Sequence, residues 1–319
     1  MDNAYLAELL TVRDYLRFAV SRFTEAGLAY GHGATNALDE AAFLILETLA
    51  LPHDSLDAWL DARLTRAERT KVWDIIETRV VTRKPAAYLV NAAYIGPHRF
   101  FVDPRVIVPR SFIGELLCTD DNSLPFGLPA PPARILDLCT GSGCLAIVSA
   151  HLFPDAAVVA VDLSFDALAV ADENIKRHAM GARIETLQSD LFAALGSRTF
   201  DLILCNPPYV TAAAVAAFPP EHKTEPVMAH HGGGDGMDLV RRIIEQAALH
   251  LAPGGTLVME IGQCRPTLER DYPDLPFLWL ETEHSSGEVF TLDKAALGAP
   301  KSAAKRSKTR PAGKAPRRA

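Results

Sequence analysis

The segment Asn206-Pro207-Pro208-Tyr209 directly follows the apolar run FDLILC, and its residue types fit a reaction at a nitrogen atom. The two prolines fix the backbone and remove two N–H donors, so the nearby carbonyl oxygens can only accept hydrogen bonds. The Asn206 side-chain oxygen and the Pro207 carbonyl could then hold the two hydrogens of a planar NH2 group, with the Tyr209 ring against its flat face. We therefore predict that these four residues are catalytic. The alternative is a proline-rich turn that binds nothing.

Three acidic residues follow consecutive apolar runs that have the length of strands. Asp137 lies in ARILDL, Asp162 ends VVAVD and Asp190 lies in QSDLF. In open parallel sheets, ligands bind beyond the carboxyl ends of the strands. A carboxylate at the end of the second strand, where Asp162 stands, binds ribose hydroxyls in such folds. Asp190 could accept a hydrogen bond from an adenine amino group, with Leu191 beside the ring. Each acid alone could cap a helix, but their shared register predicts a nucleoside ligand.

The segment between the first acid and the next predicted helix is rich in small residues. Cys139-Thr140-Gly141-Ser142-Gly143 would let the chain turn tightly and lie against a ligand. Ala146 and Ile147 stand where the dinucleotide fingerprint has its third glycine, which disfavours NAD or FAD. The alternative is a tight turn between a strand and a helix, without a ligand.

These residues need a sheet to position them, and the pattern after Ala133 predicts one. Apolar runs alternate with amphipathic stretches, from ARILDL and GCLAIVSAHLF to a helix at 237–251 and strands at 256–261 and 288–292. Strands that alternate with helices indicate a parallel, doubly wound α/β sheet. Ser164 is the expected N-cap of the helix FDALAVADENIKRHA, with Gly181 at its exit.

The chain before this sheet divides into smaller parts. Apolar residues recur at helical spacing up to about residue 83, which predicts an N-terminal helical domain over 1–85. Two strands at 87–95 and 99–108, turning at Gly96-Pro97, predict a connecting β-hairpin over 86–108. The catalytic domain would cover 109–297, with a proline-rich loop at 120–132. The tail, 298–319, would be disordered.

Composition narrows the class of protein. Across 319 residues, the best apolar stretch, 144–153, is too short to span a bilayer, and the start MDNAYLAELL has two acids and no base, unlike a secretory signal. The five cysteines form no C-x-x-C pair, so neither a disulfide framework nor structural zinc is favoured. We expect a cytoplasmic protein that does not enter the membrane.

Charge is unevenly distributed along the chain. Residues 300–319 hold eight Lys or Arg and no acid, which leaves −15 on residues 1–299 within the total of −7. An acidic body repels nucleic-acid phosphates and suits a basic partner. The tail could contact RNA or could serve only as a solvated extension.

Three histidines, His222, His230 and His231, lie near these motifs. No carboxylate or cysteine stands at ligand spacing with them on a recognisable helix. We therefore expect no bound metal.

Together the motifs resemble the class I S-adenosylmethionine-dependent methyltransferases, and NPPY resembles the members that methylate a planar NH2 nitrogen. The segments 83–111, DLCTGSGCLAI, NPPYV and 225–244 resemble, in this order, the protein N5-glutamine methyltransferases. The segment 18–41 is most similar to the branch that acts on large-subunit ribosomal protein three, rather than on peptide-chain release factors. The resemblance covers most of the chain and implies a Rossmann-like doubly wound fold.

The resemblance also implies roles for individual residues. Cys139 to Gly143 would wrap the methionine end of S-adenosylmethionine, Asp162 would bind its ribose, and Asn206 would lie between the cofactor and the substrate amide. Phe112 and the pair His230-His231 depart from the family pattern, so the substrate side differs more from the family than the cofactor side does.

The expected activity is methyl transfer from S-adenosylmethionine to the side-chain amide nitrogen of a glutamine in a large-subunit ribosomal protein. Three alternatives stay open. They are a release-factor glutamine methyltransferase, a nucleobase N6-adenine methyltransferase, and a noncatalytic ribosome-associated module that binds a nucleoside. The acidic body disfavours the second, because duplex binding needs bases on the folded surface, and the intact NPPY disfavours the third.

Overall fold

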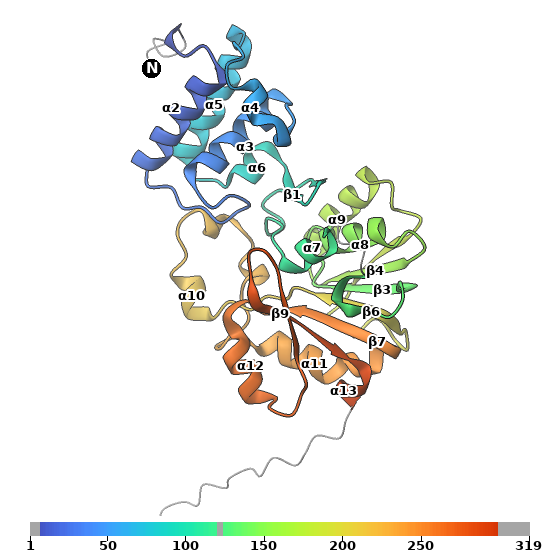
Figure 1. Ribbon diagram of the computed structural model, residues 1–319. Coiled ribbons are helices and arrows are strands. Elements are labelled where there is room, and N and C mark those ends of the chain that lie inside the picture. The colour runs from blue at the N-terminus through green and yellow to red at the C-terminus, as the bar shows by residue number, and fades with distance from the viewer. Residues whose placement is uncertain (1–6, 120–123, 299–319) are drawn as a thin grey trace, which may run out of the picture.

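The computed structural model describes residues 7–119 and 124–298 and contains a helical part and a sheet-containing part, joined by a short hairpin (Figure 1). Most of the predicted tail and residues 120–123 of the predicted loop lie outside these ranges. The described end of that loop contains a 3-10 turn over Pro125–Gly127. Among the described residues, no helix combines the length and apolarity needed to cross a bilayer.

The helical part begins each of its three longer helices at a polar capping residue. Thr11, Asn36 and Thr65 each accept hydrogen bonds from backbone N–H groups of the first turn, which would otherwise lack partners. The apolar faces of these helices enclose a core that includes the fully buried Tyr15 and Phe23. The helices of this part are α2 (Val12–Glu25), α3 (Ala37–Leu49), α4 (Leu56–Trp59), α5 (Arg66–Thr82) and α6 (Ala86–Val90).

The connecting hairpin is shorter than the sequence predicts. Its strands are β1 (Ala93–Ile95) and β2 (His98–Phe100), and the start of the predicted first strand is instead the helix α6. This part of the prediction is wrong because Pro85 leads into two alanines, which favour a helix, and Asn91 ends that helix in the left-handed conformation. The predicted second strand stops at Phe100, and Pro104, which lacks an N–H donor, lies beyond its end.

The sheet-containing part is built on seven strands in the order β5-β4-β3-β6-β7-β9-β8. The first five in this order are parallel, β9 runs antiparallel to β7, and β8 runs antiparallel to β9. The chain enters at β3 and adds β4 on one side and β6 on the other, so the strand order reverses at β3. This is the doubly wound α/β class that the alternating pattern predicted. The strands are β3 (Arg134–Leu138), β4 (Ala157–Asp162), β5 (Ile184–Gln188), β6 (Phe200–Cys205), β7 (Leu251–Glu260), β8 (Leu278–Glu281) and β9 (Ser286–Asp293).

Helices cover both faces of this sheet and bury two separate apolar clusters against it. The helix α9 lies close to its predicted range, with the Ser164 side chain accepting from the Ala167 N–H as its N-cap. The edge strand β8, which pairs with β9, was not predicted. The helices of this part are α7 (Phe112–Leu117), α8 (Cys144–Leu152), α9 (Phe165–Arg177), α10 (Ala212–Ala216), α11 (Asp238–His250), α12 (Arg265–Asp271) and α13 (Lys294–Gly298).

Candidate active site

The parallel register brings three predicted site residues to one edge of the sheet. Cys139, Asp162 and Asn206 lie at the carboxyl ends of β3, β4 and β6, and the residues just before them pair directly across the sheet. Cys139 adopts the left-handed conformation at φ 59°, which is uncommon for a residue other than glycine. The switch point of the doubly wound sheet is therefore where the predicted residues meet.

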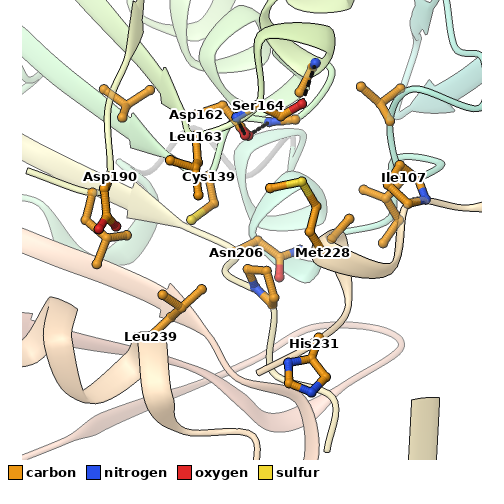
Figure 2. A pocket seen from close by; sticks show the side chains of 18 of the residues that line it. Ile107, Cys139, Asp162, Leu163, Ser164, Asp190, Asn206, Met228, His231 and Leu239 are labelled. Atoms are coloured by element: carbon orange, nitrogen blue, oxygen red, sulfur yellow. Dashed lines mark hydrogen bonds between the residues drawn. The ribbon is translucent and has the colours of Figure 1, made fainter. Parts of the chain in front are cut away.

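Two cavities meet at this edge. The larger has a volume of about 400 Å³, and Figure 2 shows Asp162, Asp190 and Asn206 around it. The smaller, of about 210 Å³, lies along the NPPY segment. Residues that line both cavities are Ile107, Cys139, Gly141, Asn206, Pro208 and Ala229. Asn206 thus stands between a cavity on the glycine-turn side and one on the NPPY side.

Asp162 connects the glycine turn to the larger cavity. Its Oδ2 accepts from the Gly141 N–H at 2.9 Å, and its Oδ1 accepts from the Ser164 N–H at 2.9 Å. Burial raises the pKa of this carboxyl above its ordinary value, although these backbone donors act in the opposite direction. Each carboxylate oxygen has a second lone-pair direction, so the group can still accept from hydroxyls in the cavity.

The structure separates the predicted cofactor residues into three groups. Those lining the larger cavity are Cys139, Gly141, Asp162, Asp190, Leu191 and Asn206. Thr140 and Ser142 line the smaller cavity. Asp137 and Gly143 line neither, and their role in cofactor binding stays a prediction.

Asp137 and Gly143 stabilise the glycine turn through buried contacts. The Asp137 Oδ2 accepts from the Thr140 hydroxyl at 2.5 Å and from the Ala146 N–H at 3.0 Å. Its Oδ1 is buried with no hydrogen-bond partner among the described residues, and burial raises the pKa of this carboxyl to about 7. Gly143 allows close packing, since an added Cβ would lie 3.1 Å from the Ala171 Cβ on α9.

Asp190 lies at the exposed rim of the larger cavity. Its Oδ2 lies 2.9 Å from the Arg242 guanidinium, and about half of the side chain is open to solvent. An exposed ion pair of this kind is worth at most about 1 kcal/mol, so the carboxylate can exchange partners at low cost. Leu191, which follows it, is buried in the left-handed conformation and lines the same cavity.

Hydrogen bonds hold two of the four NPPY residues in place. The Asn206 Nδ2 donates to the Arg110 carbonyl at 3.3 Å, which directs the oxygen end of the amide away from that carbonyl. The Tyr209 hydroxyl donates to the Glu260 Oε1 at 3.1 Å. Pro207 and Pro208 lie between these two anchored side chains and line the smaller cavity. The segment is thus fixed at both ends.

Glu260 joins the NPPY segment to the start of α7. Its Oε2 accepts from the Ser111 hydroxyl at 2.8 Å and from the Phe112 N–H at 2.9 Å. Burial raises the pKa of this carboxyl to about 7, against the effect of its hydrogen bonds. Sequence reasoning missed Glu260, although a glutamate within the apolar run TLVMEI was a visible signal that a buried carboxyl needs partners.

Three glycines surround Tyr209 so closely that a side chain at any of them would clash. An added Cβ would lie 2.7 Å from the Tyr209 Cα at Gly232, 2.3 Å from its carbonyl oxygen at Gly236, and 2.6 Å from its ring at Gly262. Val210 pairs with this same segment, because its N–H donates to the His230 carbonyl and its carbonyl accepts from the Gly232 N–H. The packing around Tyr209 therefore requires glycine at positions 232, 236 and 262.

A buried carboxylate joins the loop that follows NPPY to the helical part of the chain. Glu225 lies with its Oε2 3.0 Å from Arg110 and 2.9 Å from His230, while its Oε1 accepts from the Val108 N–H at 2.8 Å. His32, from the YGHG loop, lies 3.5 Å from the same Oε2. Burial alone would raise the pKa of Glu225, but its contacts with the two histidines and with the arginine hold it well below the usual range.

His230 therefore faces a carboxylate. The His222 ring lies against the His32 ring, with centroids 4.1 Å apart and a tilt of 52°, and burial lowers the pKa of His222 to about 4. Sequence reasoning missed Glu225 and this contact between distant segments, because a local pattern carries no sign of contacts between residues about 190 positions apart.

Comparison with known proteins gives three results. The family model described as "Methyltransferase small domain" matches residues 125–218, a range that contains the glycine turn and NPPY. A ribosomal protein uL3 glutamine methyltransferase from Neisseria gonorrhoeae is 52% identical over 298 residues, which cover 93% of this chain and 99% of that protein. One from Bradyrhizobium diazoefficiens is 51% identical and covers 91% of this chain and 92% of its own length.

One solved structure gives a more distant match. The hMettl16 catalytic domain in complex with MAT2A 3'UTR hairpin 1 aligns with a TM-score of 0.46 and 14% identity, covering 79% of this chain and 90% of that one. This degree of likeness carries no conclusion about substrate.

Proposed function

The chain belongs to the ribosomal protein uL3 glutamine methyltransferase family, and from this premise we propose that it methylates the side-chain amide nitrogen of a glutamine in uL3, with S-adenosylmethionine as the methyl donor. The observation that carries the proposal is the position of Asn206, at the junction of the two cavities and anchored through its donor end. The larger cavity would hold the cofactor, and the target amide would approach from the smaller one.

The larger cavity fits a nucleoside with a charged amino-acid arm. Asp162 would accept from the ribose hydroxyls, and Asp190 with Leu191 would lie toward the base. The unpartnered, buried Oδ1 of Asp137 is an acceptor for a donor that reaches it through the glycine turn. When bound, S-adenosylmethionine supplies a methyl group that its positively charged sulfonium already activates.

Alignment of the amide is the task left to the protein. An amide nitrogen is a poor nucleophile, since its lone pair is delocalised into the carbonyl. The Asn206 oxygen and the Pro207 carbonyl would accept the two N–H hydrogens, draw electron density toward nitrogen and aim the lone pair at the methyl group. Near-attack geometry of about 3 to 3.5 Å between the reacting atoms would then supply most of the rate enhancement.

Proton removal needs no strong base. The nitrogen becomes acidic once it carries the new methyl group, so a hydrogen-bond acceptor can take the proton late. Because positive charge on sulfur disappears as the bond forms, a site shielded from water also favours the reaction. Tyr209, held by Glu260, would close the flat side of the amide.

The partner class follows from charge as well as from the relatives. Residues 1–299 carry −15, which favours a basic protein substrate over a nucleic acid. Ribosomal proteins that contact RNA are basic as a class, so the acidic body complements them. We assign any contact with RNA to the basic tail, 298–319. The affinity of that contact would fall with added salt.

One assay tests this function against its alternatives. The full chain is incubated with methyl-labelled S-adenosylmethionine and, separately, with uL3, a peptide-chain release factor and adenine-containing duplex DNA. We expect label on uL3 alone, with a single-methyl mass gain on a glutamine-containing peptide. Label on the release factor or DNA instead, or on none of the three, would overturn the proposal. Asn206→Ala serves as the catalytically impaired control.

A further inference from the structure

Three histidines from three different elements meet on the surface of the sheet-containing part. His98 belongs to β2, His151 lies in the last turn of α8, and His178 follows the end of α9. One ring nitrogen of each lies within 4.8 Å of the others. None of the three lines either active-site cavity, so the cluster is separate from the proposed reaction.

The spacing of these nitrogens suits one metal ion. The His151 Nε2 and the His178 Nδ1 are 3.3 Å apart, and two ligands at about 2.0 to 2.1 Å from a tetrahedral Zn²⁺ are separated by about 3.3 to 3.4 Å. Even if all three separations were at the 4.8 Å limit, a central ion would lie about 2.8 Å from each nitrogen. Each ligand would then need to move by only about 0.7 Å.

His178 is already oriented as a metal ligand. Its Nε2 lies 2.9 Å from the Arg99 carbonyl, which can only accept, so this nitrogen carries the proton. The Nδ1 lone pair is therefore directed to His151. Metal-binding histidines usually donate their second ring N–H to a carbonyl or carboxylate in this way. The ring also stacks on Phe100 with centroids 5.1 Å apart, which restricts its rotation.

We propose that His98, His151 and His178 bind a single divalent transition-metal ion such as Zn²⁺ and so fasten the connecting hairpin to α8 and α9. Imidazole nitrogens suit zinc, nickel and copper, whereas Mg²⁺ and Ca²⁺ require oxygen ligands. His151 is exposed, so water can complete the coordination. The His98 ring, which now stacks on His151 with centroids 4.5 Å apart, turns toward the pair when the ion binds.

An ion at this site would stabilise the junction between the connecting hairpin and the sheet-containing part. The hairpin that carries His98 leads from the helical part to the sheet, and its exit is already held by Asn174, whose Oδ1 accepts from the Phe101 N–H at 2.7 Å. A metal that bridges β2, α8 and α9 would add a second fastening at the same junction. Because the ion binds the folded chain and not the unfolded one, it raises the melting temperature.

Metal titration of the full, untagged chain tests the proposal. Protein treated with a chelator and dialysed is titrated with ZnSO4 by calorimetry, and its melting temperature is recorded with and without the metal. We expect one Zn²⁺ per chain and a rise in melting temperature on binding. His98→Ala and His151→Ala should each weaken binding at least about tenfold and abolish the rise.

His284→Ala is the matched control, because His284 is an exposed histidine 3.3 Å from Glu115, outside the cluster. This variant should bind Zn²⁺ as the parent does. Absence of saturable binding in the parent, unchanged binding in His98→Ala, or equal loss in His284→Ala would overturn the site. The readout uses no S-adenosylmethionine, so failure here is distinguishable from failure of the proposed methylation.

Discussion

Asn206 donates its side-chain amide to the Arg110 carbonyl at 3.3 Å and thereby ties the end of β6 to the chain that leaves the connecting hairpin. The same arginine uses its guanidinium to reach Glu225, 3.0 Å away, in the loop that follows NPPY. Arg110 thus contacts both the residue that would orient the amide and the loop on the substrate side. The acceptor end of Asn206 is set by the fold before any substrate arrives.

Asn206→Ala should fold and bind S-adenosylmethionine but lose turnover. The substitution removes one of the two acceptors that orient the amide, and loss of one positioned transition-state hydrogen bond costs about 10² to 10³ in rate. The Pro207 carbonyl remains, so some activity should persist. Single-turnover methylation of uL3 is the measurement.

Asn206→Asp keeps the hydrogen-bond acceptor for the substrate amide but removes the donor that orients residue 206 against Arg110. The carboxylate can accept the same hydrogen bond, but it cannot donate to Arg110 and it adds a negative charge between the cavities. We expect turnover below that of the parent with cofactor affinity retained. Wild-type rates in both variants would contradict the role given to Asn206.

Asp162→Ala should weaken S-adenosylmethionine binding. Hydrogen bonds to a charged group are worth about 1.5 to 3 kcal/mol, so the dissociation constant should rise about 10- to 150-fold. Asp190→Ala should change it much less, because Asp190 is about half exposed and already paired with Arg242. Calorimetric titration of both folded variants compares the two carboxylates, and an equal loss would reject this difference.

Gly262→Ala should displace the Tyr209 ring, since the added Cβ would lie 2.6 Å from it. Gly196 has nearly the same backbone conformation, φ 58° against 50°, and nothing within 4 Å of an added Cβ. Both substitutions therefore incur the same backbone penalty, about 1 to 2 kcal/mol of unfolding free energy. Only Gly262→Ala should also lower the single-turnover rate, by at least about tenfold. Equal rates in the two variants would show that the ring position does not matter.

The sequence predicted those parts of the site that depend on local pattern. Strand ends can be read from apolar runs, and the parallel arrangement then forces Cys139, Asp162 and Asn206 to one edge, as the register shows. The hairpin was wrong in its details because α6 and the predicted strand share the same apolar residues. Such short apolar runs have no periodicity that distinguishes a helix from a strand.

Contacts between distant segments were beyond the sequence. Glu260, 51 residues from Tyr209, and Glu225, 115 residues from Arg110, are acids within or beside apolar stretches, and only the fold shows what they face. The motif predicted that Asp137 binds the cofactor, which stays a prediction, and only the fold shows that its Oδ2 accepts from the Thr140 hydroxyl and the Ala146 N–H.

Glu260→Gln should change how stability depends on pH. The folded-state pKa of Glu260 is about 7, above its ordinary value of 4.5, so the folded chain binds more protons than the unfolded chain between these values. Below about pH 4.5 Glu260 is protonated in both the folded and the unfolded chain, and above about pH 7 it is ionised in both. Between these values the buried group resists ionisation, so the unfolding free energy falls as pH rises, by up to about 3 kcal/mol. Glutamine cannot ionise and removes that contribution.

Urea unfolding between about pH 5 and pH 8 measures the slope in each variant. Asp137 contributes with the same sign, because burial also raises its pKa to about 7, so Glu260→Gln should reduce the decline in stability without abolishing it. Asp235→Asn is the control: its pKa is lowered to about 2, chiefly by its hydrogen bond with Arg241, so it stays ionised throughout this range. The control should shift stability by a constant amount and leave the slope unchanged. If Glu260→Gln retains the parent's full slope, then Glu260 is ionised at neutral pH, and its contacts with Tyr209 and Ser111 are those of a carboxylate.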